Sequence, residues 1–117
     1  MYYLNMKEVE FLGASLDDLR QFPLSARRAM GHQIDRVQNG LEPDDWKPMP
    51  GIGSGVREIR VRDEAGAWRT IYIAKLPEAV YVLHCFQKKT PKTSKTDIEL
   101  ARTRLAELLA QRPRRKP

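Results

Sequence analysis

The segment Val80-Tyr-Val-Leu-His-Cys-Phe-Gln-Lys-Lys-Thr-Pro-Lys92 predicts a buried strand that ends in a lysine cluster. Residues 80–85 are apolar apart from His84 and rich in β-branched and aromatic types, as is typical of a central strand. Thr90 and Pro91 prevent an immediate helix, so the following lysines are expected on an irregular, solvated segment. We expect this segment to form an anion site. We interpret the chain before it as scaffold that builds the sheet, and the chain after it as a basic helix and tail that continue the same positive surface.

Charge is distributed unevenly along the chain. Residues 1–85 carry 11 Lys and Arg against 12 Asp and Glu, whereas residues 86–117 carry 10 against 3. The whole positive excess therefore lies in the last quarter of the sequence. A field this concentrated attracts and holds negative charge, which favours a polyanion or an acidic protein as the partner.

Length and composition limit the possible architectures. The 117 residues suffice for one domain with a single core, which we expect over residues 1–111, followed by a disordered basic tail over residues 112–117. No apolar run approaches the ~20 residues of a membrane span, and the start lacks a signal-peptide pattern, so we expect a cytoplasmic protein. The lone Cys85 is interpreted as a buried, inert thiol. No metal-ligand spacing is present, and no metal or cofactor is expected.

The first third of the chain predicts a strand and two helices. A ragged strand is expected within residues 1–12, ended by Gly13. Apolar residues at helical spacing then predict helices over residues 15–39, with a bend at Phe22-Pro23 because proline fits only the first turn of a helix. The pair forms a helical hairpin whose apolar face is expected on the sheet.

Residues 41–55 are rich in proline and glycine and predict a loop without regular structure. The stretch Gly51-Ile-Gly-Ser-Gly55 leads into a strand, whereas a phosphate-binding loop leads into a helix. We therefore interpret it as a flexible lead into the sheet. Trp46 is interpreted as an anchor packed on the core in preference to a base-stacking platform.

The remaining chain predicts an antiparallel meander and a helix. Strands are expected over residues 56–62, 68–74 and 80–86. Alternation in the first of these places Ile59 and Val61 against the helices, and Glu58 and Arg60 on the opposite, open face. Thr96 and Glu99 form a capping box before an apolar stripe that predicts the C-terminal helix. The expected class is therefore α+β, with a mainly antiparallel twisted sheet in the order β-α-α-β-β-β-α.

This order, together with four motifs, resembles the RelE/HigB toxin superfamily, and most closely its phage-derived Gp49-like branch. The motifs are Glu58-Ile-Arg60, Arg69-Thr-Ile-Tyr72, Leu83-His-Cys-Phe-Gln-Lys-Lys-Thr90 and Thr93-x-x-x-Asp97-Ile-Glu-x-Ala101. The resemblance covers nearly the whole chain. Members of the family often have proline where this chain has Ser94, a difference that concerns loop stiffness.

The resemblance implies the toxin of a type II toxin–antitoxin pair that enters the ribosomal A site and cuts mRNA without a metal or cofactor. It also implies a cognate antitoxin, commonly with a helix-turn-helix domain. By motif position, the residues around the scissile phosphate are Arg60, Arg69, Lys88 and Lys89. Tyr72 and His84 match the pattern as well.

RNA cleavage by attack of its own 2′-hydroxyl needs alignment, charge stabilisation and two proton transfers. Parity predicts that Arg60, Arg69 and Lys88 converge on one open surface, although a single bulge would move later side chains to the other face. Glu58 and His84 are the candidates for the general base, and His84 equally fits a core histidine with satisfied hydrogen bonds. Further RNA contacts are expected from the basic residues Lys92, Lys95 and Arg102.

Two other functions fit the sequence. A ParE-like protein has the same scaffold, binds DNA gyrase and catalyses nothing, but it has no need of the cations at positions 60, 69, 88 and 89. A nucleic-acid-binding regulatory module would use the basic end for phosphates alone. Salt-dependent binding without cleavage products would indicate the second alternative.

Overall fold

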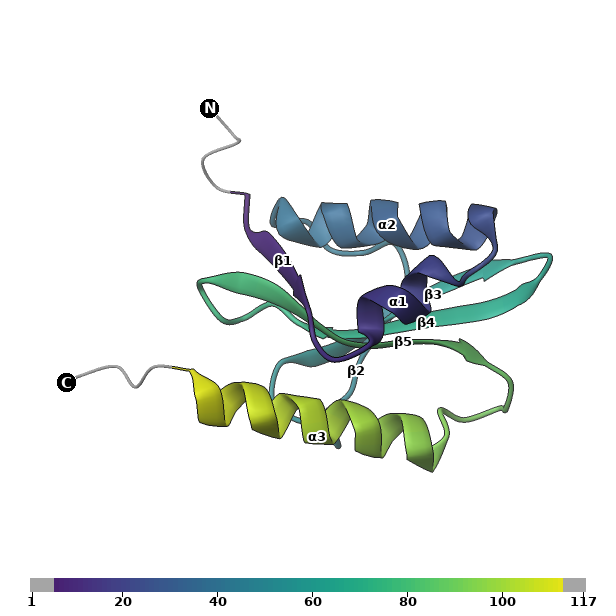
Figure 1. The fold of residues 1–117 in the computed structure, drawn as a ribbon. Helices are drawn as coiled ribbons and strands as arrows, with labels where there is room; N and C mark the ends of the chain where they lie inside the picture. The colour runs from purple at the N-terminus through teal and green to yellow at the C-terminus, as the bar shows by residue number, and fades with distance from the viewer. Residues whose placement is uncertain (1–5, 113–117) are drawn as a thin grey trace.

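A computed structural model describes residues 6–112, and its ribbon is a sheet with helices on both faces (Figure 1). Five strands lie in the order β1-β5-β4-β3-β2; β1 runs parallel to β5 and all other neighbours are antiparallel. The predicted α+β class with a mainly antiparallel sheet is confirmed. The elements are β1 Glu8–Phe11, α1 Ser15–Arg20, α2 Leu24–Gln38, β2 Trp46–Pro48, β3 Val56–Asp63, β4 Gly66–Ile73, β5 Ala79–Lys88 and α3 Lys95–Gln111.

Helices α1 and α2 cover one face of the sheet. Their inward residues recur at helical spacing, and Pro23 stands at the N-cap of α2, where its missing N–H costs no hydrogen bond. Ile59 and Val61 face these helices, as predicted. The buried residues of this core are Leu19, Phe22, Ala26, Met30, Ile34, Val37, Ile59, Trp68, Tyr72, Val80, Val82 and Cys85.

Helix α3 covers the opposite face, so the prediction that this face is open was wrong (Figure 1). Ala101, Leu105 and Leu108 of α3 pack on the sheet in a second apolar cluster. Glu58 lies beneath this layer and is 0% exposed. Sequence parity gave the correct face for Glu58 but could not show that the apolar stripe of α3 would close over it.

The chain between α2 and β3 contains a short strand where a loop without regular structure was predicted. Trp46–Pro48 pairs antiparallel with β3 at the sheet edge, where Pro48 is tolerated. Trp46 packs against the guanidinium of Arg57, which lies 3.9 Å from its ring centroid, and not on the apolar core as expected.

The cap of α3 also differs from the prediction. The helix begins at Lys95, and the N-cap is Ser94, whose Oγ accepts a 3.1 Å hydrogen bond from the Asp97 N–H. The expected cap by Thr96 and Glu99 was therefore placed two residues too late. The hydroxyl of Ser94 therefore makes the cap.

The two ends of the chain lie largely outside the described residues. The strand expected within residues 1–12 begins at Glu8, and residues 113–117 of the predicted tail are not described. Arg112, the first residue of that predicted tail, forms a salt bridge with Glu78 at 2.6 Å. Within residues 6–112 no helix has the length and apolar character needed to cross a bilayer. Cys85 is buried, and burial raises the pKa of its thiol to about 12, as expected of an inert cysteine.

Candidate nucleic-acid and active site

Three cationic residues share the face of the sheet that α3 covers. Arg60 of β3 is the register partner of Arg69 of β4, and paired residues point to the same face. Arg69 is in turn the partner of Phe86 in β5, and Lys88 lies two residues further along the same strand. The predicted convergence of Arg60, Arg69 and Lys88 on one face is therefore found, although Arg69 is only 3% exposed and the surface is not open.

A β-bulge at Leu83 makes this arrangement possible. Ile71 pairs with His84 and Tyr72 pairs with Val82, so Leu83 is the extra residue in β5. Val82 faces α1 and α2. Without the extra residue, strict alternation along β5 would point His84 and Lys88 toward these helices as well. The carbonyl of Leu83 accepts a 2.8 Å hydrogen bond from Arg104 Nη1 of α3. The bulge is thus held by the helix that covers the site.

Glu58 and Arg69 form the buried centre of the site. Arg69 Nε lies 3.5 Å from Glu58 Oε1, and neither atom has a hydrogen-bond partner within the described chain. Burial lowers the pKa of Arg69; the carboxylate of Glu58 opposes this shift, and the charge of Arg60 adds to it. Two buried, incompletely bonded charges are costly. Their arrangement leaves one donor and one acceptor available to a further group.

Thr93, in the loop before α3, covers the Glu58–Arg69 pair on the side that faces away from the sheet. Its Oγ1 donates a 2.8 Å hydrogen bond to Glu58 Oε2, and Thr93 is itself buried. The loop therefore lies directly over the Glu58–Arg69 pair. A polymer such as RNA reaches Arg69 only if this loop moves.

His84 is held by a second polar contact from α3. Its Nε2 lies 2.7 Å from Asp97 Oδ1, and Ser94 Oγ donates to the other carboxylate oxygen of Asp97 at 2.6 Å. The imidazole stacks on Phe86 with ring centroids 4.8 Å apart, and its Nδ1 is buried without a partner. His84 therefore has one ring nitrogen with a hydrogen-bond partner and one without, and its role as a general base stays a prediction.

The lysine cluster forms the rim of the site. Desolvation, followed by the charge of Arg69, lowers the pKa of Lys88, which is half-buried. Lys89 is exposed. A cavity of about 220 Å³ lies between this segment and the start of α3, and another of about 200 Å³ lies beside Arg60 and Arg69. The rim therefore offers concave, positively charged surface on two sides of the buried pair.

The other predicted residues lie further out or on another face. Lys92 and Lys95 are exposed, and Lys95 pairs loosely with Glu99 at 3.9 Å. Arg102 donates a 2.7 Å hydrogen bond to the carbonyl of Gly51. Tyr72 packs in the core beneath α2, on the opposite face, and takes no part in the site.

Sequence reasoning did not assign roles to Thr93, Ser94 and Asp97, which close the site. The Ser-x-x-Asp spacing of Ser94 and Asp97 before an apolar stripe was a usable helix-start signal. Recognition of that cap would have placed Asp97 on the first turn, near the end of β5. The bond from Thr93 to Glu58 joins residues 35 positions apart, and no local pattern indicates it.

A comparison with known protein families matches residues 17–106 to "Phage derived protein Gp49-like (DUF891)". The match spans more than three quarters of the 117 residues, from α1 to the second half of α3. It includes every residue of the site described above. No curated protein matches the chain.

Proposed function

The chain belongs to the phage-derived Gp49-like family, and from this we propose that it is a toxin that cuts mRNA on the translating ribosome. The family is a toxin-like family of the RelE/HigB type, associated with toxin–antitoxin systems. Family membership supports a toxin with a cognate antitoxin. Support for cleavage comes from the geometry of the site.

The observation that carries the proposal is the cationic site around Arg69. Arg60, Arg69 and Lys88 share one face, and Arg69 Nε is buried without a hydrogen-bond partner. A phosphate oxygen is the acceptor that such a guanidinium suits, because arginine binds phosphate through two parallel N–H groups. A ParE-like gyrase inhibitor has no need of this arrangement.

The chemistry that we propose uses the RNA's own nucleophile. The 2′-oxygen forms a bond to phosphorus while the bond from phosphorus to the 5′-oxygen breaks, which yields a 2′,3′-cyclic phosphate and a 5′-hydroxyl. Arg60, Arg69 and Lys88 offset the charge that develops on the non-bridging oxygens. Lys88, with its lowered pKa, is suited to donate the proton that the 5′-oxygen takes up.

A general base must take the proton of the 2′-hydroxyl. The candidates are still Glu58 and His84, each of which has one buried atom without a hydrogen-bond partner, Oε1 and Nδ1 respectively. Both are covered by the segment from Thr93 to Asp97. The proposed reaction therefore begins with movement of this segment away from the sheet.

The closed geometry supports the proposal that cleavage depends on the ribosome. Binding to ribosomal RNA through Lys89 and the exposed residues Lys92, Lys95 and Arg102 would place the site at the A site, in the cytoplasm. The ribosome would also hold the mRNA with its 2′-hydroxyl in line. Such positioning is worth about 7–11 kcal/mol of barrier in the best intramolecular cases. We propose in addition that the antitoxin, of the helix-turn-helix type, covers this basic surface or displaces α3.

The test compares cleavage of naked mRNA with cleavage of mRNA on programmed 70S ribosomes, without added divalent metal beyond that required by the ribosomes. Arg69→Ala and Lys88→Ala should each slow ribosomal cleavage by about 100-fold or more. Arg28→Ala is the matched control, because Arg28 is exposed on α2. Equal cleavage of both substrates would rule out ribosome dependence, and full activity of both variants would rule out the site.

The same experiment separates the alternatives. Absence of cleavage together with inhibition of DNA gyrase would favour the ParE-like function. Salt-dependent RNA binding without products would favour a regulatory nucleic-acid-binding module. Products that carry a 2′,3′-cyclic phosphate would support the attack by the 2′-hydroxyl.

A further inference from the structure

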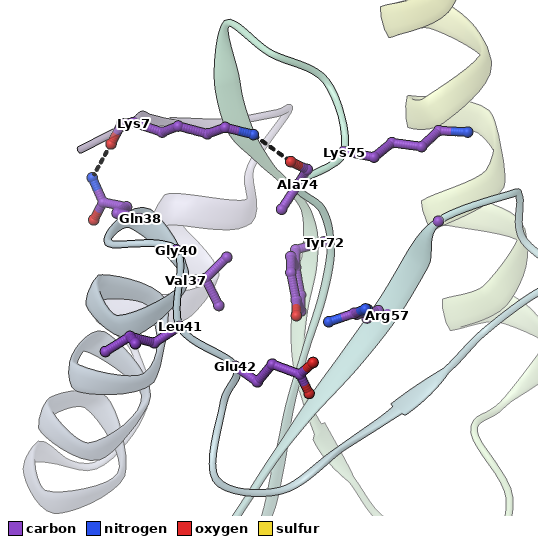
Figure 2. Close-up of a pocket in the computed structure, with 11 residues that line it drawn as sticks. Lys7, Val37, Gln38, Gly40, Leu41, Glu42, Arg57, Tyr72, Ala74 and Lys75 are labelled. Atoms are coloured by element: carbon purple, nitrogen blue, oxygen red, sulfur yellow. Dashed lines mark hydrogen bonds between the residues drawn. The ribbon is translucent and has the colours of Figure 1, made fainter. Parts of the chain in front are cut away.

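A cavity of about 370 Å³ lies on the face of the sheet opposite the cationic site. It opens between the end of α2, the turn that follows it, and the strands β3 and β4 (Figure 2). Its volume lies within the range of small-molecule sites. The lining residues are Lys7, Val37, Gln38, Gly40, Leu41, Glu42, Gly55, Arg57, Tyr72, Ala74 and Lys75.

The hydroxyl of Tyr72 is the first sign that this cavity binds a ligand. Tyr72 is 1% exposed, and its hydroxyl oxygen is buried without a hydrogen-bond partner within residues 6–112. A buried hydroxyl without a hydrogen-bond partner destabilises the fold, and a ligand that accepts its proton in a hydrogen bond would remove this cost. Burial raises the pKa of Tyr72, and nearby Arg57 opposes the shift, so the phenol keeps its proton and is available as a donor.

Arg57 supplies a second donor beside the hydroxyl. Figure 2 shows the Arg57 guanidinium beside the Tyr72 hydroxyl, with the carboxylate of Glu42 below both groups in the view. Trp46 fixes both charged groups, since Arg57 stacks on its ring and its indole N–H donates a 3.0 Å hydrogen bond to Glu42 Oε2. The guanidinium is thereby held in place, and among the described residues 6–112 no carboxylate forms a salt bridge with it.

The rest of the lining combines apolar side chains with an excess of positive charge. Two of the lining residues are apolar: Leu41, which is 53% exposed, and Val37, which is buried. Lys7 and Lys75 add positive charge, although their ammonium groups already donate to Ala74 and Leu76 carbonyls and to Ser54 respectively. Three cationic residues against Glu42 favour a ligand with negative charge and an apolar body.

We propose that this cavity binds a small organic anion, whose oxyanion accepts hydrogen bonds from the Tyr72 hydroxyl and the Arg57 guanidinium and whose body packs on Val37 and Leu41. A carboxylate and a phosphate ester share this chemistry. The cavity is separate from the cationic site on the α3 face. The test of ligand binding is therefore independent of the test of RNA cleavage.

The test is an NMR titration of the full chain with phenyl phosphate and with benzoate, which share an aromatic body and differ in the oxyanion. The backbone amides of Gly40 and Gly55, which line the cavity, should shift on binding. The probe that binds with the higher affinity shows whether the cavity prefers a phosphate ester or a carboxylate. Benzyl alcohol, which lacks the oxyanion, should shift neither amide.

Variants decide whether the proposed donors are the ones used. Arg57→Gln should weaken binding about tenfold or more, and Tyr72→Phe about fivefold, as expected for a charged and a neutral hydrogen bond. Arg28→Gln, the same change on the exposed face of α2, should leave binding unchanged. If Arg57→Gln fails to fold, Tyr72→Phe removes one oxygen atom and gives the answer alone. Absence of binding, shifts confined to residues 88–92, or equal affinity in Tyr72→Phe would overturn the proposal.

Discussion

Helix α3 is held on the sheet by different interactions at its two ends. At the C-terminal end, Leu105 and Leu108 are buried in an apolar cluster, where each leucine contributes about 1.5–3 kcal/mol. At the N-terminal end, Thr93 and Asp97 make single hydrogen bonds to Glu58 and His84. Such bonds contribute about 0.5–3 kcal/mol each, and water can replace them when the segment moves.

This difference shows how one helix can anchor the fold and cover a site at the same time. The apolar end holds α3 on the sheet, whereas the polar end can open at smaller cost and leave the helix attached. The residues that we propose for RNA cleavage all lie at the polar end. The central claim is that this polar end is a closed functional site.

The largest effect on stability is expected from Glu58→Gln. Glu58 is the only acidic residue paired with Arg69 among the described residues, and its loss leaves a buried guanidinium without a counter-charge. The free energy of unfolding should fall by about 3–5 kcal/mol in chemical denaturation. Glu64→Gln, at an exposed position in the turn between β3 and β4, is the control. A loss below about 1 kcal/mol would show that Arg69 does not depend on Glu58.

Leu105→Ala should destabilise the apolar end by about 2–5 kcal/mol, because it leaves a cavity where Leu105 packs on the sheet and on Gly53. Leu109→Ala on the same helix should change stability by less than about 0.5 kcal/mol, since Leu109 is 50% exposed. Cleavage per folded molecule should stay at the level of the unsubstituted protein. A specific loss of cleavage in Leu105→Ala would show that the two ends are not separable.

Thr93→Val removes the hydroxyl that closes the site and keeps the side-chain volume. The free energy of unfolding should fall by about 1.5–3 kcal/mol, as for a hydrogen bond to a charged group. Amide hydrogen exchange should speed up over residues 89–97 and stay unchanged at the C-terminal end of α3. Thr96→Val, at an exposed position, is the control. Faster exchange over the whole helix would contradict independent opening.

The smallest effect concerns Glu78 and Arg112, where α3 ends. Hydrogen bonds from Arg112 lower the pKa of Glu78 to about 2, from an ordinary value of 4.5. Because the folded-state pKa is depressed, the stabilisation is complete above pH 4.5 and is lost as the pH falls through about 2. The melting temperature of Glu78→Gln should therefore be slightly lower at neutral pH and equal to that of the unsubstituted protein below pH 2. A difference independent of pH would contradict this role.

The sequence predicted the elements better than it predicted what lies over the site. Strand parity and helical spacing placed Ile59 and the α1–α2 hairpin correctly, because these are local periodicities with one apolar face. The three-residue strand β2 was missed because its pairing with β3 is a long-range contact within a segment rich in proline. Local pattern gives no sign of such pairing.

The site itself was predicted in composition but not in geometry. The charge run and the family motifs indicated Arg60, Arg69 and Lys88. Their common face depends on the bulge at Leu83, which the alternating pattern does not reveal. The burial of Glu58 depends on where α3 docks, which is a tertiary contact. The cavity beside Tyr72 had no signal in the sequence.

One measurement tests the central claim most directly: single-turnover mRNA cleavage on programmed ribosomes by the double variant Glu58→Leu/Arg69→Met. Replacing both partners of a buried ion pair by apolar residues of similar size is often neutral or stabilising, so the variant should fold at least as stably as Glu58→Gln. If the polar end is a functional site, cleavage should fall by about 100-fold or more despite the intact fold. A folded double variant that cleaves within about threefold of the unsubstituted rate, a difference of less than 1 kcal/mol, would contradict the claim.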